Sequence, residues 1–270
     1  MIPISVTVNT LKTEAFSMQY IRFGSGEKSM VILPGLSVQS VMPLAQDVAK
    51  AYEIFSEQYT VYLFDRRAEL PEEYTVRDMA LDTAKAMDAL GLKDVDLFGV
   101  SQGGMMALVI AIERGDLVHR LALGSTTSRV SADRAPALNE WVRLAEAQDG
   151  PGLYLAFGRE VYPPAMYEQF KDALRAAGES VTAEDFRRFV ILTKGMNGFN
   201  VTDRLTEIRC PVLVIGEMND QVLDSDDTME IAVKLDDQPG FRLFMYAGYG
   251  HAAYDTAPDY KERVFRFFDQ

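Results

Sequence analysis

The residue with the clearest chemical context is Ser101, in the run Gly99-Val100-Ser101-Gln102-Gly103. The run fits G-x-S-x-G, with a β-rich segment (95–100) before it and an apolar helical segment (102–113) after it. A serine on so sharp a turn has a strained backbone, and the turn leaves no room for side chains two positions to either side. Its Oγ would lie at a helix N-terminus, where the N–H of Gln102 can stabilise a charged oxygen. The pattern predicts a nucleophilic serine.

With Gly104 added, this motif resembles the nucleophile elbow of the α/β-hydrolase superfamily. The resemblance spans nearly the whole chain, because the order and spacing of the predicted segments and a helical insertion between them also agree with it. It implies catalytic partners that follow the serine in the order Asp or Glu, then His. It also implies acyl chemistry through a covalent intermediate, with no metal and no organic cofactor.

The general base has two candidates, His119 and His251. His251 ends the run Gly248-Tyr249-Gly250-His251, after the last β-rich segment and before the C-terminal helical segment, where the resemblance places the catalytic histidine. His119 comes too early in the chain and stands among charged residues at the start of a strand. We therefore predict His251 as the base and interpret His119 as a solvated residue at the edge of the sheet.

The resemblance places the acid in the loop after the penultimate β-rich segment (212–215), where the chain reads Gly216-Glu217-Met218-Asn219-Asp220. We choose Asp220. Many family members have this carboxylate three residues after the glycine, where this chain has Asn219, so an ambiguity of one residue remains. Asparagine could orient an imidazole but could not stabilise its charged form. The other carboxylates of the region stay as alternatives: Glu217, Asp224 and Asp226.

An oxyanion hole needs a second N–H besides that of Gln102. In the family it comes from the loop after an early strand, which here follows residues 31–33 and reads Pro34-Gly35-Leu36-Ser37. We predict the backbone N–H of Leu36 as this donor. The family often has His-Gly at this point. Proline departs from that pattern, but a main-chain donor survives the change.

Eight short β-rich segments must position these residues. Two antiparallel segments at one edge, 4–8 and 18–23, lead through Gly24-Ser25-Gly26, which we interpret as a hairpin turn, into a third, 30–33. The other five are separated by enough chain for crossovers: 61–64, 95–100, 121–123, 212–215 and 243–246. With helical segments between them, they predict an α/β fold with a mostly parallel, doubly wound, eight-stranded sheet.

A helical stretch interrupts this alternation at residues 129–200. Helical composition covers 138–147, 167–177 and 183–194, and Gly and Pro separate these segments. We predict a helical cap over 129–200, inserted into a core domain of residues 1–128 and 201–270. Three aromatic residues of the cap either pack within it or line an apolar substrate pocket: Trp141, Tyr154 and Phe157.

Two further features are interpreted as structural. The run Phe64-Asp65-Arg66-Arg67 resembles the family's Asp-Arg-Gly turn without its glycine, and we interpret Asp65 and Arg66 as an ion pair. Cys210, the only cysteine, cannot form an internal disulfide or a thiolate metal cluster, and is interpreted as an inert core thiol.

Composition restricts the partners. The chain of 270 residues is 48% hydrophobic and 25% charged, which is typical of globular proteins. Its net charge of −13 disfavours nucleic-acid binding. No apolar run reaches the ~20 residues needed to cross a bilayer, so no membrane partner and a cytoplasmic location are expected. A homodimer is left open.

The function predicted from these residues is that of a serine hydrolase whose partner is a small-molecule acyl substrate. A carboxylic ester is favoured because an alkoxide leaves more easily than an amine. The same triad would also serve an acyltransferase, a carbon–carbon bond hydrolase, a prolyl-type aminopeptidase or a cofactor-free perhydrolase. The alternative from another class is a weakly catalytic, ligand-binding protein of the same fold.

Overall fold

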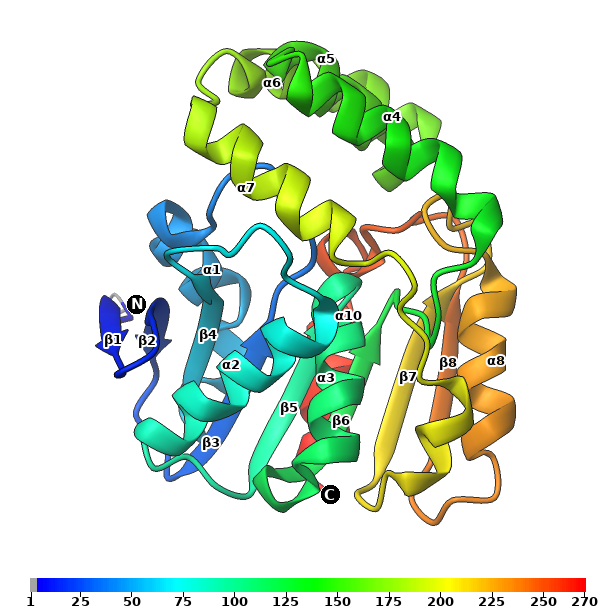
Figure 1. Ribbon diagram of the computed structural model, residues 1–270. Helices are drawn as coiled ribbons and strands as arrows, with labels where there is room; N and C mark the ends of the chain where they lie inside the picture. Colours follow the sequence, from blue (N-terminus) through cyan, green and yellow to red (C-terminus); the bar gives the residue numbers. More distant parts are fainter. Residues whose placement is uncertain (1–3) are drawn as a thin grey trace.

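A central sheet of eight strands organises the protein, whose computed structural model describes residues 4–270 (Figure 1). The strand order is β1-β2-β4-β3-β5-β6-β7-β8. β1 pairs with β2 and β2 with β4 in antiparallel fashion, and every other pair is parallel. The predicted α/β fold is therefore confirmed. The strands are β1 Val6–Lys12, β2 Ser17–Phe23, β3 Lys28–Leu33, β4 Tyr59–Arg67, β5 Val95–Val100, β6 Val118–Gly124, β7 Val212–Glu217 and β8 Arg242–Tyr246.

Helices cover both faces of this sheet (Figure 1). Side chains alternate along each strand, so Val31 and Leu33 of β3 pack into one apolar layer while Met30 and Ile32 pack into the other. The first layer contains α2, α3 and α8, and the second contains α1 and α10. The bounds of the core helices are α1 Ala45–Ala51, α2 Val76–Ala89, α3 Gln102–Glu113, α8 Ser225–Leu235, α9 Ala253–Thr256 and α10 Tyr260–Phe268.

Four helices lie together above the carboxyl ends of the parallel strands: α4 Ala135–Glu146, α5 Gly150–Val161, α6 Pro164–Gly178 and α7 Ala183–Lys194 (Figure 1). Three of them, α4, α5 and α7, share a separate apolar cluster that includes Trp141, Leu153 and Phe189. Because the parallel strands end beneath them, residues that follow those strands face the four helices.

Helix α5 is absent from the predicted helical segments, because Gly150-Pro151-Gly152 at its start is a sequence typical of a break between helices. In the structure these residues form its first turn. The Asp149 carboxylate accepts from the Gly152 N–H at 2.8 Å, and a proline in a first turn lacks only a donor that would have no partner there. A Cβ on Gly150 would lie 2.0 Å from the Gly178 carbonyl oxygen, so the glycine permits close contact between α5 and α6.

The hairpin predicted at Gly24-Ser25-Gly26 was also wrong. Strand β4 lies between β2 and β3, so these two strands are not neighbours. The two glycines instead let the chain pass close to the segment that enters β4. A Cβ on Gly26 would lie 1.8 Å from the carbonyl carbon of Gln58, and Gly24 has φ +78°. The glycines indicate a break between β2 and β3, but not whether these two strands pair.

Within residues 4–270, no helix combines the length and the apolar character that crossing a membrane requires.

Candidate active site

Ser101 stands between β5 and α3 in a strained backbone conformation. Its φ of 53° and ψ of −122° are unusual for a residue with a side chain. Neighbouring glycines make this turn sterically feasible. A Cβ on Gly103 would lie 2.0 Å from the Leu33 carbonyl oxygen, and one on Gly99 would lie 2.5 Å from the Gly103 carbonyl oxygen. The sharp strand-to-helix turn expected from G-x-S-x-G is present.

His251 and Asp220 form a buried hydrogen-bonded pair. His251 Nδ1 lies 2.8 Å from Asp220 Oδ2, and the two side chains are 5% and 4% exposed. The other Asp220 oxygen accepts the backbone N–H groups of Val222 at 2.8 Å and Leu223 at 3.0 Å. Because an ionised carboxylate only accepts, the pairing assigns the proton to Nδ1 and leaves Nε2 available to accept a proton from a hydroxyl.

The other carboxylates considered as the acid have different partners. Glu217, at the end of β7, accepts the N–H of Asn219 at 3.1 Å, of Gly248 at 2.9 Å and of Tyr249 at 3.1 Å. It therefore ties the loop that carries Asp220 to the loop that carries His251. Its position at the carboxyl end of a buried strand is the signal that could have indicated this.

Asp224 and Asp226 belong to the start of α8, where the Asp224 carboxylate caps the helix. Among the acids considered from the sequence, Asp220 alone contacts His251 in the described chain. The competing histidine, His119, lies at the amino end of β6, 43% exposed, with Nδ1 3.1 Å from Asp94 Oδ1. Its exposure fits the interpretation as a solvated residue, but β6 is an interior strand, so His119 lies at the end of the sheet and not on an edge strand.

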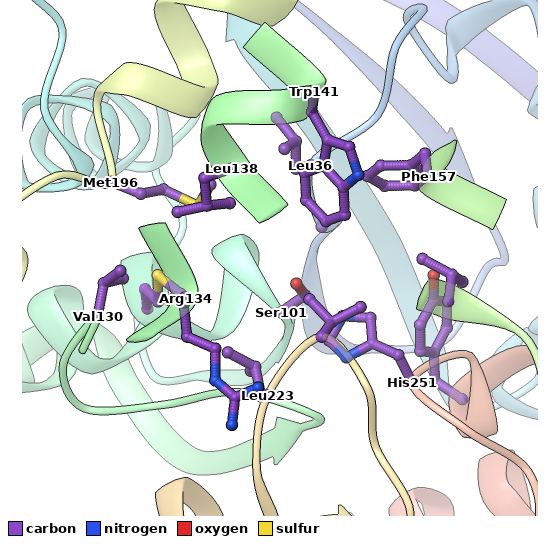
Figure 2. Close-up of a pocket in the computed structure, with 15 residues that line it drawn as sticks. Leu36, Ser101, Val130, Arg134, Leu138, Trp141, Phe157, Met196, Leu223 and His251 are labelled. Atoms are coloured by element: carbon purple, nitrogen blue, oxygen red, sulfur yellow. The ribbon is translucent and has the colours of Figure 1, made fainter. Parts of the chain in front are cut away.

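Ser101 and His251 line one cavity of about 50 Å³ (Figure 2). Figure 2 shows Ser101 between the His251 ring and the side chains of Leu36 and Trp141. In the part of the chain that the structure describes, the Ser101 Oγ makes no hydrogen bond. Ser101 and His251 are neighbours in the cavity wall. The remaining walls are mostly apolar: Met105, Val130, Leu138, Phe157, Val161, Met196, Val222, Leu223 and Tyr254.

The three cap aromatics predicted to bind substrate do not share one position. Trp141 and Phe157 line the cavity beside Ser101, and their ring centroids are 4.8 Å apart. Tyr154 instead lines an adjoining cavity of about 440 Å³, where its hydroxyl donates to Gln39 Oε1 at 2.9 Å. Phe157 also lines this second cavity, so its side chain lies between the two spaces.

One cation in the cavity wall was not anticipated. Arg134, at the N-terminal end of α4, lines the cavity and pairs with Asp224 at 3.3 Å. Its position depends on how α4 lies over the core, which no local motif encodes. The thiol of Cys210 lies outside the cavity, and burial raises its pKa to about 11, which disfavours the reactive thiolate.

The loop predicted to hold the second oxyanion donor passes directly beside the serine. Gly35 and Leu36 follow β3 and both line the cavity, and a Cβ on Gly35 would lie 3.2 Å from the Ser101 Cβ. Gln102 is the first residue of α3, where backbone N–H groups lack acceptors within the helix. The structure thus brings both backbone segments to Ser101.

Asp65 and Arg66 do not form the ion pair that was predicted between their side chains. They lie within β4, which extends to Arg67, and so point to different partners. Asp65 pairs with Arg188 of α7, whereas the Arg66 guanidinium donates to the Pro34 carbonyl at 2.9 Å and to Gln102 Oε1 at 2.8 Å. Burial lowers the pKa of Arg66 to about 10.

Comparisons with known proteins agree with this architecture. The sequence profile of the Alpha/beta hydrolase family matches residues 30–262, so the chain belongs to this family, as the resemblance predicted. A protein named putative carbamate hydrolase RutD from Pseudomonas savastanoi pv. phaseolicola is 26% identical over 194 residues, which is 71% of this chain and 73% of the relative. A protein of the same name from Caulobacter sp. (strain K31) is 26% identical over 78% of this chain and 81% of the relative.

Solved structures show the same fold at low identity. MGS-M2, an alpha/beta hydrolase enzyme from a Medee basin deep-sea metagenome library, superimposes with a TM-score of 0.85 at 19% identity and covers 97% of this chain and 98% of its own. The enol-lactonase from Burkholderia xenovorans LB400 gives a TM-score of 0.82 at 16% identity, and the match covers 97% of this chain and 100% of the lactonase.

Proposed function

We propose that this member of the α/β-hydrolase family is a serine hydrolase that cleaves a small carboxylic ester through an acyl-enzyme. The observation that carries the proposal is the combination of a strained serine with a buried His251–Asp220 pair at 2.8 Å in the wall of one apolar cavity. A serine hydroxyl becomes a nucleophile when a neighbouring base accepts its proton, and the base needs a third group to orient it.

In the proposed reaction, the Ser101 Oγ attacks the acyl carbonyl carbon while His251 Nε2 accepts the hydroxyl proton. His251 then returns this proton to the leaving alkoxide. Asp220 keeps the imidazole in the required tautomer and stabilises its charged form. The backbone N–H groups of Leu36 and Gln102 hold the oxyanion. Water hydrolyses the acyl-enzyme by the same proton transfers.

The size of the cavity supports a short acyl group. Its volume of about 50 Å³ is well below the roughly 150 Å³ of a cavity that binds benzene. The adjoining cavity of about 440 Å³ shares four lining residues with it, Leu36, Phe157, Val161 and Tyr254. One of the shared residues, Val161, accepts the N–H of Ala252, the residue after His251, at 3.1 Å, so we assign the leaving group to this second space.

A carbamate is a second candidate substrate. The observation that favours it is the name of the RutD relatives, putative carbamate hydrolase. A carbamate also presents an acyl carbon to a serine, so the same residues would act in the same roles.

Labelling with a fluorophosphonate tests the mechanism. We expect one adduct on the intact protein, placed on Ser101 by peptide mapping and absent from Ser101→Ala. An adduct that persists in Ser101→Ala would overturn the proposal.

A series of p-nitrophenyl esters from acetate to octanoate, run beside p-nitrophenyl N-methylcarbamate, then tests the substrate. We expect kcat/KM to fall as the acyl chain lengthens, and faster turnover of the carbamate than of acetate would favour the second candidate.

We also propose that residues 129–200 act as a cap that selects the substrate, with residues 1–128 and 201–270 as the catalytic core. The separate apolar cluster of α4, α5 and α7 supports this division. A cytoplasmic location, action on small molecules rather than on nucleic acids or membranes, and a homodimer stay predictions from the sequence.

A further inference from the structure

A single buried guanidinium connects the two backbone segments assigned to the oxyanion hole. One nitrogen of Arg66 donates both to the carbonyl of Pro34, at 2.9 Å, and to Gln102 Oε1, at 2.8 Å. Pro34 precedes Gly35 and Leu36, whose loop passes beside Ser101, and Gln102 follows Ser101 directly. The arginine is 4% exposed, so water does not compete for these hydrogen bonds.

The Gln102 side chain has a defined orientation between this guanidinium and the cap. Its Nε2 donates to the carbonyl of Leu192 on α7 at 2.8 Å, while its Oε1 accepts from Arg66. Because one end must donate and the other accept, the amide cannot be reversed without losing both bonds. The side chain is fully buried. A helix of the cap is therefore hydrogen-bonded to the residue that follows the nucleophile.

The neighbouring residue Asp65 makes a second connection among the same segments. Its carboxylate pairs with Arg188 of α7 and accepts the hydroxyl of Ser40, which lies further along the loop that begins at Pro34. It also accepts the backbone N–H of Arg66 at 2.7 Å. Arg188 and Leu192 are one helical turn apart, so the same face of α7 contacts both connections.

Burial of the Arg66 guanidinium costs free energy, and its two side-chain hydrogen bonds offset that cost only in part. Transfer of a guanidinium out of water is unfavourable, and the two acceptors that Arg66 contacts through its side chain are neutral. A buried arginine that bonds two neutral groups on separate segments contributes defined spacing more than net stability. That spacing matters here, because oxyanion donors act only when they lie about 2.7–3.1 Å from the developing charge.

We propose that Arg66 is a positioning residue that sets the distance between the Leu36 and Gln102 donors, and that α7 of the cap takes part in this through Gln102 and Asp65. The proposal rests on the proposed function. It implies that the position of α7 and the distance between the two oxyanion donors depend on each other. Displacement of α7 therefore weakens binding of the tetrahedral intermediate more than binding of the substrate.

The test compares Arg66→Met with wild type on p-nitrophenyl acetate and on ethylboronic acid, which forms a tetrahedral adduct with a reactive serine. We expect kcat to fall about 10²-fold with KM nearly unchanged, and the Ki of the boronic acid to rise by a similar factor. Inhibition by acetate, the planar product, should stay the same. Arg66→Lys, which keeps a charge and a donor, should recover part of both losses.

Arg120→Met is the matched control, because Arg120 is also mostly buried and lies 3.9 Å from Asp96 at the opposite end of the sheet. It should reduce stability without changing kcat or the boronic acid Ki.

Gln102→Met keeps the backbone donor but removes the side-chain bonds, so it should repeat the Arg66→Met signature at about 10-fold. This variant also serves if Arg66→Met does not fold. Arg188→Met should show the same signature more weakly.

Folded Arg66→Met and Gln102→Met proteins with wild-type kcat and wild-type boronic acid Ki would overturn the inference. That result would leave the proposed function intact, provided that fluorophosphonate still labels Ser101. Failure of wild-type protein to react at Ser101 would instead overturn the proposed function itself.

Discussion

The molecule contains two histidine–aspartate pairs at opposite ends of its sheet, and they differ in everything except residue type. His251 and Asp220 lie 2.8 Å apart with side chains that are 5% and 4% exposed. His119 and Asp94 lie 3.1 Å apart, and their side chains are 43% and 79% exposed. Two backbone N–H groups orient the buried aspartate, and the buried imidazole faces a cavity that also holds Ser101.

The difference shows which features make a histidine–aspartate pair suitable for catalysis. Water screens an exposed pair, and an exposed imidazole can rotate between partners, so its contribution to stability is small. Burial strengthens the electrostatic interaction of the inner pair, and the anchored carboxylate allows only one tautomer of the ring. Position at the carboxyl ends of the parallel strands then supplies the nucleophile and the cavity. We therefore expect the inner pair to be catalytic and the outer pair to be dispensable.

The largest expected effect is that of His251→Ala, because Ser101 then has no base. We expect kcat on p-nitrophenyl acetate to fall by about 10⁵-fold or more. His119→Ala is the matched control and should leave kcat and KM unchanged, with a change in unfolding free energy of at most about 0.5 kcal/mol. Similar losses in the two variants would contradict the distinction between the pairs.

The second effect is that of Asp220→Asn, which preserves the shape of the side chain but favours the wrong imidazole tautomer. We expect a loss of about 10⁴-fold in kcat. Asp94→Asn changes the corresponding residue of the outer pair and should have no effect on kcat. Asn219→Ala addresses the ambiguity of one residue in the sequence. Should Asn219→Ala cost more activity than Asp220→Asn, the acid has been assigned to the wrong position.

Glu217→Gln should have an intermediate effect, because this residue holds the loop before His251 without contacting the ring. Glutamine offers one acceptor where three N–H groups now point. We expect a loss of about 1–3 kcal/mol in unfolding free energy. A small displacement of His251 should also lower kcat by about 10- to 100-fold. Steady-state kinetics and urea unfolding measure the two effects.

Glu113→Gln is the control for Glu217, since Glu113 is also largely buried but pairs with Arg77 and Arg204 away from the cavity. It should reduce stability and leave kcat unchanged. A Glu217→Gln protein that loses stability but retains full activity would show that the loop is held in place by its other contacts.

The smallest effect concerns Asp96, which lies at the same end of the sheet as the outer pair. Burial raises the pKa of this carboxyl to about 6. The native state therefore holds a proton that the unfolded chain releases near pH 4, and the stability due to this proton is lost as pH rises from about 4 to about 6. The loss is up to about 3 kcal/mol.

Urea unfolding at pH 4.5 and pH 8 measures this effect. We expect Asp96→Asn to reduce the difference in stability between the two pH values, and to be more stable than wild type at pH 8. Activity should not change, because the residue is far from the cavity. An undiminished pH difference in Asp96→Asn would mean that another group accounts for it.

Local signals predicted the parts of the site that depend on neighbours in the chain. The G-x-S-x-G run indicated the turn at Ser101 because its glycines are required by contacts within a few residues and with the adjacent strand. Chain order then separated His251 from His119. The same reasoning left the acid open, since Glu217, Asp220 and Asp224 all follow the same strand and only the path of the loop distinguishes them.

The errors came from contacts that are distant in the chain. The predicted hairpin was wrong because β4 lies between β2 and β3 in the sheet, and the predicted Asp65–Arg66 pair was wrong because Asp65 pairs with Arg188 of α7. Likewise, only the fold shows that Tyr154 lines the second cavity alone, whereas Phe157 lines both cavities.

The sequence by itself determined which atoms could react: one serine on a turn that only glycines permit, one histidine in the right order, and a carboxylate between them. Those features depend on short-range sterics and on chain order, which a linear pattern records. Only the tertiary structure decided which carboxylate contacts His251, that Arg66 connects Pro34 to Gln102, and how the four helices α4 to α7 lie over Ser101. These depend on packing between elements that are far apart in the chain, and no local preference specifies it.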